Sequence, residues 1–499
     1  AMATQVADVM QLLQELPMWQ LVPLVAVVVL ASLVVGRLVM NNIPGKTPPV
    51  FEGIPFIGGV IKFTKDRPMK LMADGYAKYG EVFTVPVLNR RITFLIGPDV
   101  VSHFFKGTDD EMSQTEVYDY SVPTFGKGVV YDVDTKIRTE QFRWFVEALK
   151  KDRLKNYVPM FVMEAEQYFS KWGNEGIIDF GKEFGRLITL TAARTLLGRE
   201  VREQMFEQVT ELLHDLDEGM VPLSVIAPYA PIAVHRRRDA ARDKLREIFG
   251  KIVRNRRQSG QREEDVLQQF VDAKYQNAYG GRAASEEEIA GLLIAVIFAG
   301  QHTSSITTAW TGYHMVTDKA KAFKEAQEEQ RRVIKEHGDK LDFDILQGME
   351  TLHRCVSEAL RMHPPLVLVL RYARTSFTVK TGAGKEYVIP KGDVCAVSPN
   401  FSHMLPTVFK NPEKYDIERW LPPREEDKSK PFAWMGFGGG RHACLGQNFA
   451  YLQIKTIWSV LLRNFDFEML DPVPEPDYQG MVIGPKPCRV KFTRKKLVV

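Results

Sequence analysis

Cysteine is scarce in this chain. The 499 residues include only Cys355, Cys395, Cys444 and Cys488, and no two of them have the CxxC spacing of zinc or redox motifs. So few cysteines in so long a chain argue against a zinc site or a disulfide scaffold. They favour reduced thiols in a protein that faces the cytosol.

An excess of charge of one sign is also missing. The chain has 66 Lys and Arg against 62 Asp and Glu, a net charge of +4, which gives no reason to expect a nucleic-acid partner. Internal repeats and low-complexity tracts are absent from the sequence as well. Apolar residues make up 45% of the chain, which is enough to bury a substantial core.

One long apolar run is present, from Met18 to Met40, and its strongly polar residues, Gln20 and Arg37, lie near its ends. A helix of this length can span a bilayer, which needs about 20 residues. Acidic residues precede the run, whereas Arg37 and Lys46 lie at its C-terminal end, so the positive-inside rule predicts a cytoplasmic body. A cleaved signal peptide and a buried core helix are the alternatives.

A proline-rich stretch follows this run, and proline cannot continue a helix. No other break in composition is found in the sequence. The chain therefore divides into an N-terminal stub (1–17), a transmembrane anchor helix (18–40), a hinge (41–50) and one large domain (51–499).

Most of the large domain has the apolar spacing of helices, above all from about 141 to 315. Runs rich in β-forming residues at 82–88 and 91–96 predict a hairpin. A second hairpin is predicted from 377–380 and 386–389, which flank a glycine-rich turn. The fold class is therefore mainly α with minor β.

A buried helix is predicted to begin at Ser285. Glu288 follows it at the spacing of a capping box. The next residues, 289–299, are apolar on every side of a helix, so the helix is buried. We expect it to be too short to cross a membrane.

The strongest local signal is the segment 437–446, FGGGRHACLG. Glycines such as Gly438 let the backbone approach a flat, bulky group. Cys444 directly precedes a helix predicted at 447–462, whose amide N–H groups and dipole would hold a thiolate ionised. A haem iron with an axial thiolate receives electron density that favours O–O cleavage. A structural cysteine in a glycine turn is the alternative.

This segment resembles the haem-binding loop of the cytochrome P-450 superfamily, FxxGx[RH]xCxG, through Phe437, Gly440, Cys444 and Gly446. His442 stands where many members carry Arg, and either residue can donate to a haem propionate. The resemblance implies a triangular helical prism. Haem b, iron protoporphyrin IX, would lie between a long central helix and this loop, with Cys444 as the iron ligand.

The ExxR motif of the same family is matched by Glu358 and Arg361, which share a helix face and can pair. Arg419 matches the third member of the buried Glu-Arg-Arg network of that family. The resemblance implies a structural rather than a catalytic role for these three residues.

Within the predicted buried helix, the segment 299–305 resembles the part that crosses the haem in this family. The resemblance assigns proton delivery to His302 and Thr303. Many members carry an acid at the position of His302, and histidine there is characteristic of sterol 14α-demethylases. Histidine can relay protons near neutral pH. The alternative is that the hydroxyl groups only bond back to helix carbonyls.

Two further segments, 117–120 and 126–132, resemble the sterol 14α-demethylase signature around its substrate-facing loop. The resemblance implies contacts with the haem propionates. The residues to which it assigns them are Tyr118, Tyr131, Arg371 and Arg138. It also implies an apolar pocket for a rigid, flat lipid. The walls of that pocket would be formed by Phe298, Ala299, Tyr118, Tyr120, Phe125 and Tyr131.

The resemblance implies three successive oxidations, dependent on NADPH and O2. These remove the 14α-methyl group of a sterol as formate and leave a Δ14 double bond. Electrons would come from NADPH-cytochrome P-450 reductase, and the anchor would lie in the lipid of the endoplasmic reticulum membrane. Azole-type inhibitors are expected to bind.

Tyr120 stands where members that act on sterols with one methyl at C4 carry Phe, which favours an obtusifoliol-type over a lanosterol-type substrate. Another microsomal hydroxylase of lipids or xenobiotics is the first alternative, and it predicts an acid before Thr303. A haem sensor without oxygenase chemistry is the second, and it leaves Thr303 unexplained.

Overall fold

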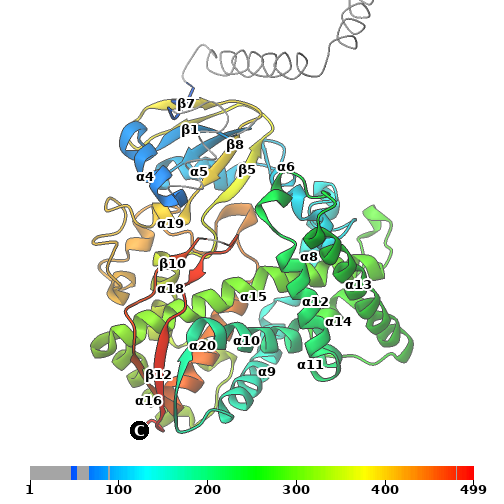
Figure 1. Cartoon of the computed structure of the whole chain (residues 1–499), viewed down its shortest axis with the longest axis vertical. Coiled ribbons are helices and arrows are strands. Elements are labelled where there is room, and N and C mark those ends of the chain that lie inside the picture. The colour runs from blue at the N-terminus through cyan, green and yellow to red at the C-terminus, as the bar shows by residue number, and fades with distance from the viewer. Residues whose placement is uncertain (1–46, 53–66, 88–89, 479, 499) are drawn as a thin grey trace, which may run out of the picture.

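The computed structural model describes residues 47–52, 67–87, 90–478 and 480–498. The predicted anchor, most of the predicted hinge and Asn89 in the first hairpin turn lie outside these residues. The described chain forms a helical body built around one long helix, with a lobe rich in strands at one end (Figure 1).

The long helix is α15 (Glu286–Thr317), and it crosses the body of the molecule (Figure 1). It begins with the predicted capping box, in which the Ser285 side chain accepts from the Glu288 amide and the Glu288 carboxylate accepts from the Ser285 amide. The prediction that this helix is too short to cross a membrane is wrong, because it runs for 32 residues and is apolar enough. It nevertheless packs against α10, α13 and α18 as the core helix of the body.

Other helices surround α15. The longer ones are α4 (Arg67–Tyr79), α5 (Pro98–Lys106), α8 (Thr135–Ala148), α9 (Lys151–Ser170), α10 (Phe180–Ala192), α12 (Phe206–Glu218), α13 (Ala233–Ser259), α16 (Lys324–His337), α18 (Glu350–Met362) and α20 (Gln447–Asn464). The shorter ones include α6 (Thr115–Tyr118), α7 (Val122–Phe125), α11 (Arg199–Gln204), α14 (Val266–Val271), α17 (Phe343–Gln347) and α19 (Pro399–Ser402).

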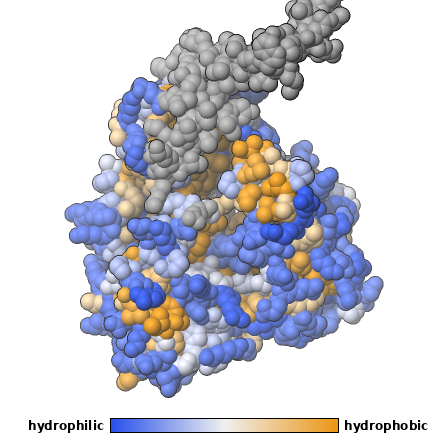
Figure 2. Space-filling view, viewed as in Figure 1, coloured by the Kyte–Doolittle hydropathy of each residue, from blue (hydrophilic) through white to orange (hydrophobic). Residues whose placement is uncertain are grey.

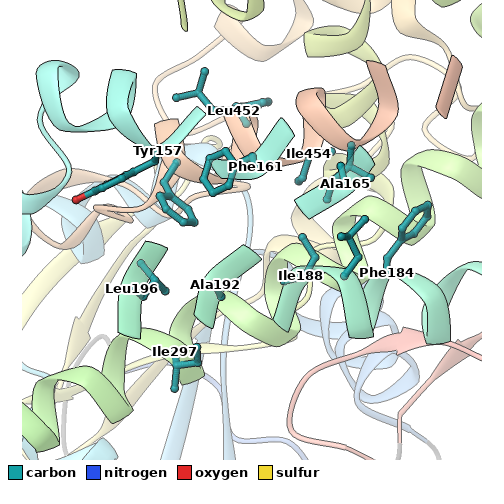
Figure 3. Close-up of a cluster of buried hydrophobic side chains, with 14 of the residues drawn as sticks. Tyr157, Phe161, Ala165, Phe184, Ile188, Ala192, Leu196, Ile297, Leu452 and Ile454 are labelled. Carbon is teal, nitrogen blue, oxygen red and sulfur yellow. The ribbon is translucent and has the colours of Figure 1, made fainter. Parts of the chain in front are cut away.

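The main core lies where α9, α10, α15 and α20 meet, and its side chains are almost all apolar (Figure 3). Members of this cluster include Tyr157, Phe161, Ala165, Phe184, Ile188, Ala192, Ile297, Leu452 and Ile454. Burial of such side chains is the largest favourable contribution to folding. This core fixes α20, which follows Cys444, relative to α15.

The strands form small sheets. The largest has the order β1 (Val82–Val87), β2 (Arg90–Leu95), β8 (Val394–Val397), β5 (Val369–Ala373) and β3 (Met112–Ser113). A three-stranded sheet has the order β4 (Glu175–Asp179), β12 (Arg489–Arg494) and β9 (Phe465–Met469). Two-stranded sheets pair β6 (Phe377–Lys380) with β7 (Glu386–Ile389) and β10 (Pro476–Asp477) with β11 (Gly484–Pro485).

Both predicted hairpins are confirmed. Strands β1 and β2 pair antiparallel with Val82 opposite Leu95, and β6 and β7 pair antiparallel with Phe377 opposite Ile389. Strand β8 joins β2 in parallel and β5 in antiparallel orientation, which unites segments far apart in the sequence. This sheet holds β5, and therefore Arg371, beside the helical body.

The surface is hydrophilic over most of the face shown in Figure 2, with local apolar patches. Large exposed apolar side chains cluster in the connection between α12 and α13. They are Leu223, Val225, Ile226 and Tyr229. Such a cluster suits contact with an apolar partner surface.

Candidate active site

Cys444 lies in the loop that leads into α20. Its amide donates to the Phe437 carbonyl over 2.9 Å, which closes the loop. Gly440 has a φ of +64°, and a Cβ there would lie 1.9 Å from the Phe105 carbonyl oxygen, so only glycine fits. The Cys444 side chain is exposed and stands just before the first turn of α20.

Two opposing effects act on the Cys444 thiol. Desolvation by the surrounding protein raises its pKa, whereas hydrogen bonds from the backbone of Gly446 and Gln447 lower it. These amides belong to the N-terminus of α20, where the helix dipole favours negative charge. Desolvation is the larger effect, so the pKa of the Cys444 thiol lies above its ordinary value. The amides at the start of α20 lie where they would stabilise a thiolate, and the ionised state of Cys444 stays a prediction.

Helix α15 packs against α20 and carries His302 and Thr303 near its middle. Ala299 is exposed, and Phe298 beside it is half-buried, as are most of the residues within one turn. The Thr303 hydroxyl donates to the Ala299 carbonyl over 2.7 Å. This is the back-bond that we considered as the alternative to a catalytic role, and it leaves the lone pairs of the hydroxyl oxygen available.

His302 makes a long-range ion pair that the sequence does not reveal. Its Nε2 lies 3.4 Å from Oδ1 of Asp217, near the end of α12. The hydrogen bond and the charge of Asp217 raise the pKa of His302 above its ordinary value, against the opposing effect of burial. Both side chains are partly exposed, so this pair connects α15 to solvent.

Basic side chains from separate elements gather near the cysteine loop. Arg138 of α8 and Arg371 of β5 are each only 3% exposed. One guanidinium nitrogen of each, Nη1, is buried and has no hydrogen-bond partner among the described residues. Buried donors without partners are rare in folded proteins. They mark a place for an anionic group, and burial lowers the pKa of Arg371.

Asp109, just after α5, links this cluster to the cysteine loop. Its Oδ1 lies 2.7 Å from His442 Nε2 and 3.5 Å from Arg138 Nη2. Burial lowers the pKa of His442, so we assign a neutral ring whose single N–H is on Nε2, facing Asp109. In this structure His442 Nε2 contacts Asp109, whereas Arg138 and Arg371 each have a buried Nη1 without a hydrogen-bond partner among the described residues. The contact of His442 with a haem propionate stays a prediction.

The predicted tyrosines come together beside these arginines. The rings of Tyr118 and Tyr131 stack with their centroids 5.3 Å apart, and Tyr120 lies 6.4 Å from Tyr118. The Tyr118 hydroxyl accepts from the Leu370 amide over 3.1 Å, next to Arg371 in β5. Burial raises the pKa of all three tyrosines, so they act as neutral hydrogen-bonding groups.

The remaining predicted pocket residues also meet. Phe125, at the end of α7, packs edge to face on Phe298 of α15 with the ring centroids 6.1 Å apart. Tyr120, on the same connection between β3 and α8, is 9% exposed. The structure thus brings the loop that is predicted to face the substrate onto α15 at Phe298, about one turn before His302.

The buried ion-pair network behind the site has the predicted members. Glu358 of α18 accepts two bonds of 2.9 Å from Arg361 and one of 2.8 Å from Arg419. All three side chains are at most 1% exposed. Arg361 also donates to the carbonyls of His403 and Pro412, so the network ties α18 to the chain before the cysteine loop.

A scan against protein-family models matches the cytochrome P-450 family over residues 48–492. The chain belongs to the cytochrome P-450 family. It is therefore a haem-thiolate monooxygenase that uses O2. Its fold agrees with that of a solved member, the retinoic acid-bound cyanobacterial CYP120A1. The TM-score is 0.77 over 90% of this chain and 99% of the other, at 21% identity.

Sequence relatives show to which group within the cytochrome P-450 family this chain is most similar among those compared. The obtusifoliol 14-alpha demethylase of Sorghum bicolor is 53% identical over 98% of this chain and 99% of its own length. The sterol 14-demethylase of Arabidopsis thaliana is 51% identical over 95% and 97%. The lanosterol 14-alpha demethylase of Homo sapiens is 36% identical over 94% and 91%. Within the cytochrome P-450 superfamily, the chain falls among the sterol 14α-demethylases.

The residues of this cytochrome P-450 fit haem b. The group needs one thiolate for its iron and donors for two carboxylates. Cys444 can supply the thiolate, and the partnerless nitrogens of Arg138 and Arg371 can bind the propionates in charge-assisted bonds. Sequence reasoning missed Asp109 and Asp217, because a lone aspartate carries no motif and both contact partners far along the chain.

Proposed function

We propose that this chain removes the 14α-methyl group of a sterol with a single methyl at C4, of the obtusifoliol type. Three successive oxidations release the methyl as formate and leave a Δ14 double bond. The observation that carries the proposal is the pairing of His302 with Asp217 in the middle of α15, directly before Thr303. A histidine at this position is typical of sterol 14α-demethylases, whereas most hydroxylases carry an acid.

Bound haem supplies the activation of O2, and the chain supplies protons and orientation. Asp217 is 44% exposed and can exchange protons with water. It passes them to His302, whose raised pKa keeps the ring protonated over more of the neutral range. The Thr303 hydroxyl follows His302 on α15. Its oxygen can accept a hydrogen bond while its own O–H donates to the Ala299 carbonyl.

Apolar and aromatic residues orient the sterol in this proposal. Phe125 and Phe298 form one wall, and the exposed Ala299 lets the substrate approach α15. Tyr120 and Tyr131, which both lie against Tyr118, form another part of the pocket lining. A neutral Tyr120 takes the place of Phe against the C4 side of the sterol. The higher identity to the Sorghum bicolor relative, 53% against 36% for the Homo sapiens relative, supports a C4-monomethylated substrate.

Electrons reach the haem from NADPH through a cytochrome P-450 reductase in this proposal. The helix predicted at 18–40 anchors the domain 51–499 in the endoplasmic reticulum membrane, with the domain in the cytosol. The exposed apolar side chains between α12 and α13 support contact with membrane lipid. Azole-type compounds, which offer a nitrogen to haem iron, would inhibit.

The test is turnover of purified protein with reductase, NADPH and a sterol panel, read by mass spectrometry. We expect the Δ14 product and formate, with obtusifoliol turned over faster than lanosterol. Faster turnover of lanosterol would contradict the substrate choice. Simple hydroxylated products from lipids or xenobiotics, with no demethylated sterol, would contradict the proposed reaction. No product from any substrate would be the outcome for a haem sensor.

A further inference from the structure

The loop that carries Phe125 and Tyr131 has an unusual backbone. Gly126, Gly128 and Val130 all have positive φ angles, of +101°, +76° and +52°. For a β-branched residue such as Val130 the left-handed region is strained, and such a conformation persists only where the surroundings hold it. Val130 is also buried, so water cannot satisfy its backbone.

Gln141 of α8 holds this strained backbone directly. Its side chain is fully buried at 0% exposure. The amide oxygen accepts from the Val130 N–H over 3.1 Å, and the amide nitrogen donates to the Gly128 carbonyl over 2.8 Å. One side chain thus grips the loop on both sides of Val129, at the point where the backbone is strained.

A chain of buried polar groups supports Gln141 from behind. Its amide nitrogen also lies 3.2 Å from the Tyr275 hydroxyl, which donates to Glu288 over 2.7 Å. Glu288 is the capping-box residue of α15, and two 2.7 Å bonds from Arg282 hold it in place. The loop is therefore connected to the first turn of α15.

The other side of the loop lies directly on α15. A Cβ at Gly291 would lie 2.6 Å from the Phe125 carbonyl oxygen and 2.8 Å from a Val129 methyl, so only glycine permits this approach. Further along, Phe125 packs on Phe298, and Tyr131 stacks on Tyr118. Any shift of the loop would move both a pocket wall and Tyr131.

We propose that Gln141 is a positioning residue for the sterol site. It clamps the loop 125–131 in its strained form against α15, and so sets the width of the pocket and the place of Tyr131. The identity of the ligand rests on the proposed function, but the clamp itself does not. No atom of Gln141 needs to touch sterol or haem for this role.

The test compares Gln141→Leu with Gln268→Leu in the haem-loaded protein. Gln268 of α14 is likewise a buried glutamine with polar contacts, to Asp272 and Arg256, and among the described residues it makes no hydrogen bond to 125–131. We expect Gln141→Leu to speed amide hydrogen exchange of 125–131 and to weaken sterol binding about tenfold, because both hydrogen bonds that hold the loop are lost. The turnover number should change less than the KM, and the reduced, carbon monoxide-bound spectrum should be retained.

A second substitution distinguishes a loss of loop positioning from a general loss of stability. Val130→Gly adopts the positive φ without strain, so in the Gln141→Leu background it should restore much of the sterol affinity. If Gln141→Leu does not fold, Tyr275→Phe serves instead, because it removes the hydroxyl behind Gln141. It should also speed exchange of 125–131.

Three outcomes overturn the clamp. In the first, Gln141→Leu exchanges the amides of 125–131 and binds sterol as the wild type does. In the second, Gln268→Leu changes loop exchange and sterol affinity as much as Gln141→Leu does. In the third, adding Val130→Gly to Gln141→Leu does not restore sterol affinity. Where Gln141→Leu does not fold, the clamp is overturned if Tyr275→Phe exchanges the amides of 125–131 at the wild-type rate. Loop exchange is measured without sterol. A wild-type protein that demethylates no sterol would therefore contradict the proposed function without contradicting the role of Gln141.

Discussion

His302 and Asp217 form an ion pair of 3.4 Å that joins the middle of α15 to the end of α12. The two residues are far apart in the sequence, and the pair lies at the boundary between α15 and solvent. Because α12 also leads into the connection with exposed apolar side chains, the pair links that part of the surface to the site.

The first prediction concerns pH. Asp217 raises the pKa of His302 in the folded protein. The stability from this pair is therefore fully present below the unfolded pKa of about 6.5 and is lost as the pH rises through the folded pKa. Asp217→Asn should lower thermal stability at pH 6, by less than about 1 kcal/mol because both groups are partly exposed, and should not do so at pH 9.

The pH dependence of turnover should also change in Asp217→Asn. If His302 donates protons, the alkaline fall in the turnover number should move to lower pH in Asp217→Asn, because the His302 pKa falls. His302→Ala should slow turnover and retain haem. Unchanged turnover in His302→Ala, or an alkaline limb that does not move in Asp217→Asn, would contradict the relay.

The second prediction concerns haem retention. Arg371→Leu removes a buried Nη1 donor that has no hydrogen-bond partner in the described part of the chain, so it should weaken haem binding by about 10- to 100-fold, the value of one charge-assisted hydrogen bond. Arg374→Leu is the matched control, since Arg374 follows the same strand but pairs with Glu116 over 2.8 Å. The measurement is the haem-to-protein ratio after dialysis against apomyoglobin. Equal losses in the two variants would contradict a propionate role for Arg371.

The third prediction concerns Asp109. Asp109→Asn removes the charge that holds His442 and Arg138, but it keeps the size of the side chain. We expect a lower haem content than in wild type and a smaller loss than in Arg371→Leu, because both guanidinium groups survive. Asp110→Asn changes the neighbouring exposed carboxylate and should have no effect. A haem content in Asp109→Asn equal to that of Asp110→Asn would refute the role.

The fourth prediction concerns the buried network. Glu358→Gln leaves Arg361 and Arg419 buried without a countercharge, which typically destabilises a protein by about 3–5 kcal/mol. The free energy of unfolding in urea measures the effect. Glu350→Gln, on an exposed position of the same helix, should stay close to wild type. A Glu358→Gln protein as stable as Glu350→Gln would show that the network is dispensable.

Local features of the fold could be predicted from the sequence because their signals are local. The Ser285 capping box, the two hairpins and the helix after Cys444 each depend on residues within a few positions of one another. The length of α15 could not be predicted in this way. Its second half is rich in Thr and Ser, which have no apolar pattern and are buried by contacts from other helices.

Site residues could be predicted from the sequence only where they belong to a motif. Cys444 and Glu358 belong to dense patterns, whereas Asp109, Asp217 and Gln141 are single polar residues in ordinary surroundings. Their roles come from tertiary contacts, such as the 2.7 Å bond between Asp109 and His442, that join distant parts of the chain. No spacing rule reports such contacts.

The central claim is that the sulfur of Cys444 ligates a haem iron as a thiolate. The most direct measurement is the absorbance spectrum of the reduced protein under carbon monoxide, for wild type and Cys444→Ser. The wild-type Soret band should shift far to the red, as only a thiolate-ligated haem does, and Cys444→Ser should lack this band. A wild-type band at the position of histidine-ligated haem, or an unchanged band in Cys444→Ser, would contradict the account.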